Sequence, residues 1–214
     1  MISSFAMHDW LTITIVFLIA LLVLVQFFDK KRFIRLVSFI KQKEYFADYN
    51  YKKVSLISLF NITIFVFQLV VYALFFYLIL LHLEIITDSF SSFYKITLAF
   101  FLFYTAKVII LRILANIFSI DSIYFFISFE RFTYSSKIAI YLFPFVILIA
   151  YMFYYNSLLT KVNIAFFAIV SLYFFIKMLW NNQKLIFYNF LYFILYLCAL
   201  EITPLVYLFK SIIS

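Results

Sequence analysis

The chain has 214 residues, of which 68% are hydrophobic and 12% charged, with a formal net charge of +8 and a mean hydropathy of +1.14. A soluble domain carries about 25% charged residues, so this composition excludes an ordinary soluble protein and indicates an integral membrane protein. Glycine is absent. Phosphate-cradling loops, dinucleotide fingerprints, nucleophile elbows and potassium-type selectivity filters all require glycine and are therefore excluded. A single cysteine, Cys198, precludes an intramolecular disulfide.

Six apolar segments are long enough to cross a hydrocarbon core of ~30 Å, which takes about 20 residues. The spans are predicted at residues 10–28, 54–81, 93–114, 138–155, 162–180 and 185–209. The first lacks a preceding basic region and a small-residue cleavage pattern, so it is expected to remain as a span. The sequence thus predicts one all-α membrane domain over residues 1–214, a polytopic bundle of about six transmembrane helices.

Two connecting segments have helical features of their own. In residues 31–41, apolar residues at 33, 36, 37 and 40 follow helical spacing, and the basic residues are Lys31, Arg32, Arg35 and Lys41. This pattern predicts a basic amphipathic helix lying on the cytoplasmic leaflet. Residues 116–136 are predicted to form a second cytoplasmic segment, in which Asp121 caps a short helix.

The basic residues orient the protein. On the six-span topology, 14 of the 17 Lys and Arg residues fall on one side, and only Lys95, Lys161 and Lys210 fall on the other. The positive-inside rule makes the first side cytoplasmic and places both termini outside. In a Gram-negative cell, both termini would then lie in the periplasm.

The sixth predicted span contains a carboxylate, Glu201, and a proline three residues later, Pro204. A carboxylate in hydrocarbon costs roughly 2.5–3.5 kcal/mol, so Glu201 is expected to face a partner rather than lipid. It lies roughly 24 Å from the cytoplasmic end of its helix, too far for a direct ion pair with Lys107 near the end of the third span. Gln68, near mid-membrane, is better placed. Glu201 is then a hydrogen-bonded structural residue, a contact for a partner subunit, or a coupling carboxylate; the sequence leaves all three open.

No residue pattern indicates catalysis or a bound cofactor. His82 and Glu84 are two residues apart, a poor spacing for metal ligands on a helix, and nothing supplies a proven third ligand. A solvated interfacial loop is the simpler interpretation. No catalytic set, metal, cofactor or nucleic-acid partner is therefore expected, and the protein is not expected to be an enzyme.

The C-terminal motif Leu195-Tyr196-x-Cys198-x-Leu200-Glu201-x-x-Pro204 resembles the signature of a multi-pass inner-membrane family of Bacteroidota. The resemblance implies about six helices, a tryptophan at the first span and a lysine in the third, here Lys107, and an inner membrane. It implies no activity. The function expected is a non-enzymatic accessory or scaffolding subunit of a cell-envelope machine such as one for protein export or secretion, with the bilayer and other membrane subunits as partners. The alternative is a small proton- or ion-coupled transporter.

Overall fold

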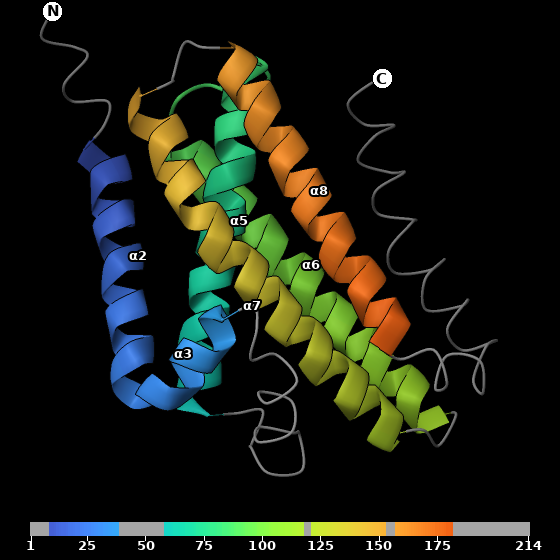
Figure 1. Cartoon of the computed structure of the whole chain (residues 1–214). Coiled ribbons are helices and arrows are strands. Elements are labelled where there is room, and N and C mark those ends of the chain that lie inside the picture. The colour runs from blue at the N-terminus through green and yellow to red at the C-terminus, as the bar shows by residue number, and fades with distance from the viewer. Residues whose placement is uncertain (1–8, 39–57, 118–120, 153–156, 182–214) are drawn as a thin grey trace, which may run out of the picture.

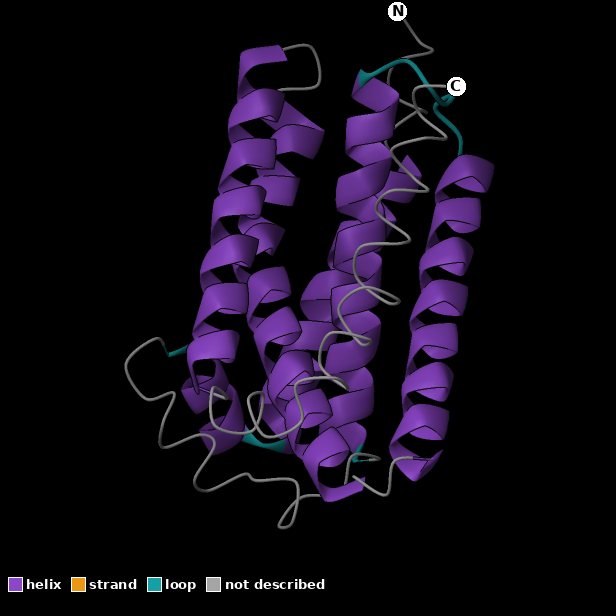
Figure 2. Cartoon of the chain, turned by 90° about the vertical axis from the view of Figure 1, so that its right-hand side faces the viewer, coloured by secondary structure: helices purple, strands orange, loops and turns teal. Residues whose placement is uncertain are grey.

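The structure is a computed structural model, and it describes residues 9–38, 58–117, 121–152 and 157–181. These residues form six helices: α2 (Asp9–Phe28), α3 (Lys30–Val37), α5 (Leu59–His82), α6 (Phe90–Ile117), α7 (Asp121–Met152) and α8 (Ser157–Asn181). The five long helices lie side by side with alternating direction, and the short α3 lies at the base of the bundle (Figure 1). Within the described ranges every regular element is a helix (Figure 2).

Four of these helices are long and apolar enough to cross a membrane: α2, α5, residues Phe90–Ile110 of α6 and residues Ile127–Tyr151 of α7. The helix-bundle prediction is confirmed at this level. One boundary differs from it. Residues from Asp121 onward belong to the same 32-residue helix as the predicted fourth span, with Pro144 inside it, so the short separate helix is wrong. α8 contains the predicted fifth span, residues 162–180, and its described apolar stretch runs over Ile164–Phe174. The sixth span, residues 185–209, lies outside the described residues.

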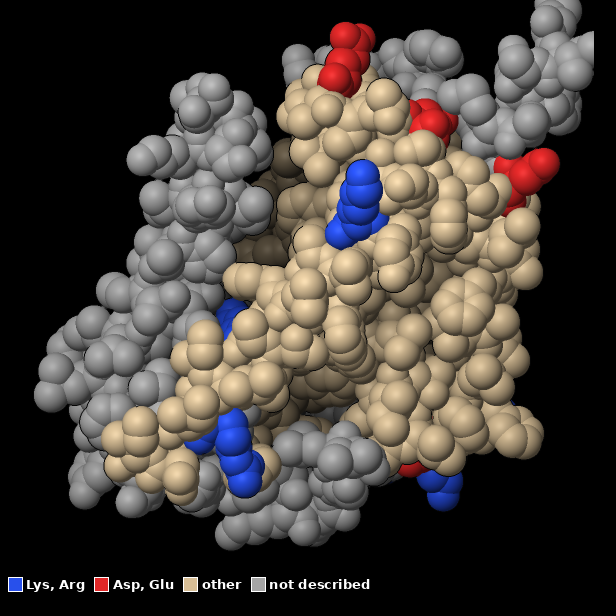
Figure 3. All heavy atoms as spheres, turned by 180° about the vertical axis from the view of Figure 1, so that it is seen from behind, with Lys and Arg blue, Asp and Glu red and all other residues tan. Residues whose placement is uncertain are grey.

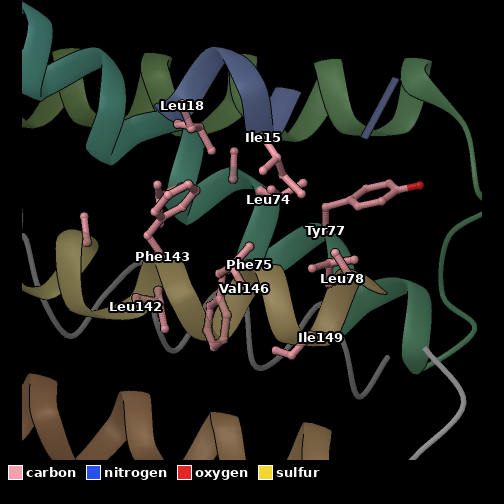
Figure 4. Packing of buried hydrophobic residues seen from close by; sticks show 14 of the residues in the cluster. Ile15, Leu18, Leu74, Phe75, Tyr77, Leu78, Leu142, Phe143, Val146 and Ile149 are labelled. Carbon is pink, nitrogen blue, oxygen red and sulfur yellow. The ribbon is translucent and has the colours of Figure 1, made fainter. Parts of the chain in front are cut away.

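The centre of the bundle is α5, which packs against α2, α6 and α7. Its buried side chains, among them Leu74 and Leu78, meet Ile15 and Leu18 of α2 and Val146 of α7 in one apolar cluster (Figure 4). In the membrane-length window of α5, 56% of residues are buried, against 6% in that of α6. The apolar periodicity of α5 therefore serves protein packing, whereas α6 lies at the edge of the bundle.

The turn after α5 shows how a chain without glycine ends a helix. Glu84 has a φ of 57°, and the N–H of Ile85 donates to the carbonyl of Leu80 at 3.1 Å. This is the Schellman arrangement, in which glycine normally takes the left-handed position. Glu84 takes it here at a cost of roughly 1 kcal/mol.

Charge is unevenly distributed between the two ends of the described part, although Lys95 lies near the acidic residues and Asp29 and Glu130 lie near the basic ones (Figure 3). Asp9, Glu84 and Asp88 lie at the start of α2 and in the turn between α5 and α6, which we call the acidic end. The opposite, basic end holds α3, the last part of α6, the first part of α7 and the end of α8. Its basic residues are Lys30, Lys31, Arg32, Arg35, Lys107, Arg112, Arg131, Lys137 and Lys177.

Candidate functional site

Buried polar side chains gather between α3, α5 and α7 in the basic half of the bundle. We call them the polar layer: Arg32, Asn61, Gln68, Glu130, Thr133, Ser136 and Lys137. Three of them are residues with ionisable side chains that are at least 97% buried, namely Arg32, Glu130 and Lys137. Burying a charge is costly unless it is paired or hydrogen-bonded. The layer is therefore the best candidate for a functional or fold-specifying site in the described part of the chain.

Arg32 joins α3 to α5. The carboxylate of Asp29 caps α3 by accepting the backbone N–H of Arg32 at 2.9 Å, and Ser58 caps α5 by accepting that of Asn61 at 3.2 Å. The two caps fix the starts of both helices, and the Arg32 Nη2 then donates to Asn61 Oδ1 at 2.7 Å. The guanidinium also lies 4.2 Å from the centre of the Phe60 ring, a cation–π contact. A neutral amide and an aromatic face thus help to hold a cation that is only 3% exposed.

The end of α3 is held by α7. The last carbonyls of a helix lack intrahelical partners and carry a partial negative charge. Lys137 Nζ donates to the carbonyl of Ser38 at 3.4 Å, and the Tyr141 hydroxyl donates to the carbonyl of Val37. Lys137 and Tyr141 are one helical turn apart, so they lie on the same face of α7. They fix the C-terminal end of α3 as Arg32 fixes its start.

Further hydrogen bonds join α5 to α7 above α3. Ser136 Oγ donates to Gln68 Oε1 at 3.1 Å, and the Tyr72 hydroxyl donates to the carbonyl of Ser135 at 2.8 Å. Asn61, Gln68 and Tyr72 are seven and four residues apart, so they form one stripe along α5. The stripe spans 11 residues, or roughly 16 Å, about half of a hydrocarbon core.

Beyond Tyr72 the interface between α5 and α7 becomes apolar. Leu74 and Leu78 of α5 face Leu142, Val146 and Ile149 of α7, all of them almost fully buried (Figure 4). The next buried polar contact, in which the Tyr77 hydroxyl donates to Asp88 Oδ1 at 2.6 Å, belongs to the acidic end. Among the described residues, the polar layer therefore ends in an apolar core and does not continue through the bundle.

The structure brings together only some of the residues expected from the sequence. Gln68 lies in the polar layer, whereas Lys107 lies half-buried on α6, outside it. Lys31 is exposed and Arg35 half-buried on α3, but Arg32 differs from the expected interfacial position because it points inward to Asn61. Glu201, Pro204 and Lys41 lie outside the described residues.

Several members of the layer were not anticipated as site residues. Asn61 falls inside the predicted second span, residues 54–81, and Lys137 immediately precedes the predicted fourth span, residues 138–155. The seven-residue spacing of Asn61 and Gln68 was an available signal, because it places both amides on one helix face. In the described ranges, no three His, Cys, Asp or Glu residues come together as metal ligands could.

Comparison with known proteins identifies one family. The family model described as "Domain of unknown function (DUF4271)" matches residues 11–212. No curated protein and no solved structure matches the chain.

Proposed function

Because the chain belongs to the DUF4271 family, whose description assigns no activity, we propose a function from the residues themselves: a non-enzymatic accessory or scaffolding subunit of a cell-envelope machine. A machine for protein export or secretion is the expected context. The partners would be other membrane subunits that pack against the apolar helices within the bilayer.

The observation that carries this proposal is the surface of α6. Among the described residues this membrane-length helix packs mainly along α5, and only 6% of its window is buried. Small residues, Ser91, Ala99 and Ala106, are exposed at intervals of eight and seven residues, within one broad face. Small residues let transmembrane helices approach closely, and an exposed lysine, Lys95, adds a polar contact on the same helix. A helix face that contacts only lipid would require neither the small residues nor the lysine.

The alternative is a small ion- or proton-coupled transporter. It is favoured by Glu130 and Lys137, two ionisable side chains buried within the span Ile127–Tyr151. Such residues commonly mark ion pathways. The apolar core beyond Tyr72 argues against a pathway through the described helices, because an ion would have to cross Leu74 and Val146 without polar contacts. The subunit function is therefore the better supported of the two.

The orientation we propose puts the basic end in the cytoplasm of a bacterium with two membranes and both chain termini in the periplasm. The separation of Asp9, Glu84 and Asp88 from the cluster of Lys and Arg on α3 and α7 supports this orientation. A reporter that is active only in the periplasm should be active after Ser214 and silent between Lys41 and Lys53. The reverse pattern would reject the orientation.

Co-purification in mild detergent tests the function itself. We expect a stoichiometric membrane partner, identified by mass spectrometry. Ala99→Trp with Ala106→Trp should reduce its recovery several-fold, because the indole rings prevent close helix approach. Ala20→Trp on the exposed face of α2 is the matched control and should leave recovery unchanged. Purification of the protein alone, together with solute movement in liposomes, would instead support the transporter.

A further inference from the structure

The corner between α2 and α3 combines exposed aromatic and aliphatic side chains with exposed lysines. Phe27 is 84% and Ile34 53% exposed, and Lys30 and Lys31 are exposed between them. We call these four residues the corner surface. Lys30 and Ile34 are one helical turn apart, so they share a face of α3 that points away from the bundle.

The corner surface is held in a fixed orientation. Its opposite face carries Arg32 and Leu36, which are 3% and 1% exposed. The bond from Arg32 to Asn61 and the donors from α7 at the end of α3 prevent the helix from turning about its axis. A ligand that binds the outward face therefore pays little to order it.

The depth of the corner matches the boundary between hydrocarbon and headgroups. α2 has 20 residues and is therefore about 30 Å long, the thickness of a hydrocarbon core. α3 starts two residues later. Aromatic side chains favour this boundary, and lysines there extend toward phosphates. Across the residues that the structure describes, neither Lys30 nor Lys31 is bonded to a carboxylate; the carboxylate of Asp29 accepts the Arg32 N–H instead.

We propose that the corner surface binds anionic phospholipid, with Lys30 and Lys31 on the headgroup phosphate and Phe27 and Ile34 against the upper acyl chain. The charge of the lysines complements the phosphate, and the apolar pair matches the remainder of the lipid. This combination favours a lipid over an acidic protein, which would leave an 84% exposed Phe27 without a matching surface. Arg32 takes no part in the contact.

Thermal unfolding of the full chain in a neutral detergent, with lipid added, tests the proposal. Phosphatidylglycerol should raise the midpoint more than phosphatidylcholine with the same acyl chains, and 0.5 M salt should diminish the difference because it screens the charges. In Lys30→Gln with Lys31→Gln the phosphatidylglycerol-specific rise should fall at least twofold, while the midpoint without lipid stays unchanged. Lys95→Gln, at the acidic end, is the control and should keep the full rise.

Two further arms separate the sources of the anion. Phe27→Ser should weaken the response to phosphatidylglycerol, whereas inorganic phosphate should give no rise in any variant. An equal rise with inorganic phosphate would overturn the lipid assignment in favour of a free anion. An unchanged phosphatidylglycerol response in the double lysine variant would overturn the corner surface as the binding site.

Discussion

Asn61→Leu is expected to destabilise the protein strongly, because it removes the amide oxygen that accepts a hydrogen bond from the buried Arg32 guanidinium at 2.7 Å. Hydrogen bonds to charged groups contribute about 1.5–3 kcal/mol. A loss of ~2 kcal/mol corresponds to a fall of roughly 4–8 °C in the unfolding midpoint for a chain of this size. The measurement is thermal unfolding of the purified protein in mild detergent.

Two comparisons show whether the loss comes from the pair. The first is Thr63→Val, two residues after Asn61 on α5. It removes a hydroxyl that donates to the carbonyl of Leu59 in the same helix, and it should change the unfolding midpoint little. Arg32→Met combined with Asn61→Leu removes the charge as well as its acceptor. Replacing both partners by apolar groups is often close to neutral, so the double variant should be more stable than Asn61→Leu alone. Equal midpoints for Asn61→Leu and wild type would show that Asn61 is not needed to hold the cation.

The helices that are long and apolar enough to cross a membrane were predictable where hydropathy and packing agree. α2 and α5 are continuous apolar runs, and their predicted and observed ranges differ by a few residues. The start of α7 was not predictable in this way, because Glu130, Arg131 and Lys137 lower the local hydropathy although two of them are buried. A hydropathy value depends only on the type of residue, whereas the burial of a polar side chain depends on hydrogen-bonding partners elsewhere in the chain.

The polar layer was only partly predictable for the same reason. Arg32 was expected at the membrane interface, although its spacing of four residues from Leu36 was an available signal that both share one face of α3. Its partner, Asn61, is 29 residues away, and no local rule connects them. Lys137 reaches the carbonyl of Ser38 across 99 residues. Such pairs depend on how α3 packs between α5 and α7, which the sequence alone does not specify.

Glu201 lies outside the described residues, and its substitution separates the two candidate functions. If the protein is a subunit, the carboxylate acts as a hydrogen-bonding group between helices or subunits. Glu201→Gln then keeps its shape and much of its bonding, and complementation should survive. If it couples transport to protons or ions, Glu201→Gln removes the titrating group and should abolish function while the protein still folds.

Under the proposed function we expect Glu201→Gln to complement a deletion strain and to recover the partner at the wild-type level. Glu201→Leu should lower partner recovery, by a modest amount, because polar contacts between transmembrane helices average only about 0.6 kcal/mol. Cys198→Ala, in the same segment, is the control and should behave as wild type. Loss of complementation in Glu201→Gln with full partner recovery would favour transport, since only a titrating role distinguishes a carboxylate from its amide so sharply. Full function in Glu201→Leu would contradict both the contact role and the coupling role of Glu201. The carboxylate would then be a structural residue whose replacement is tolerated.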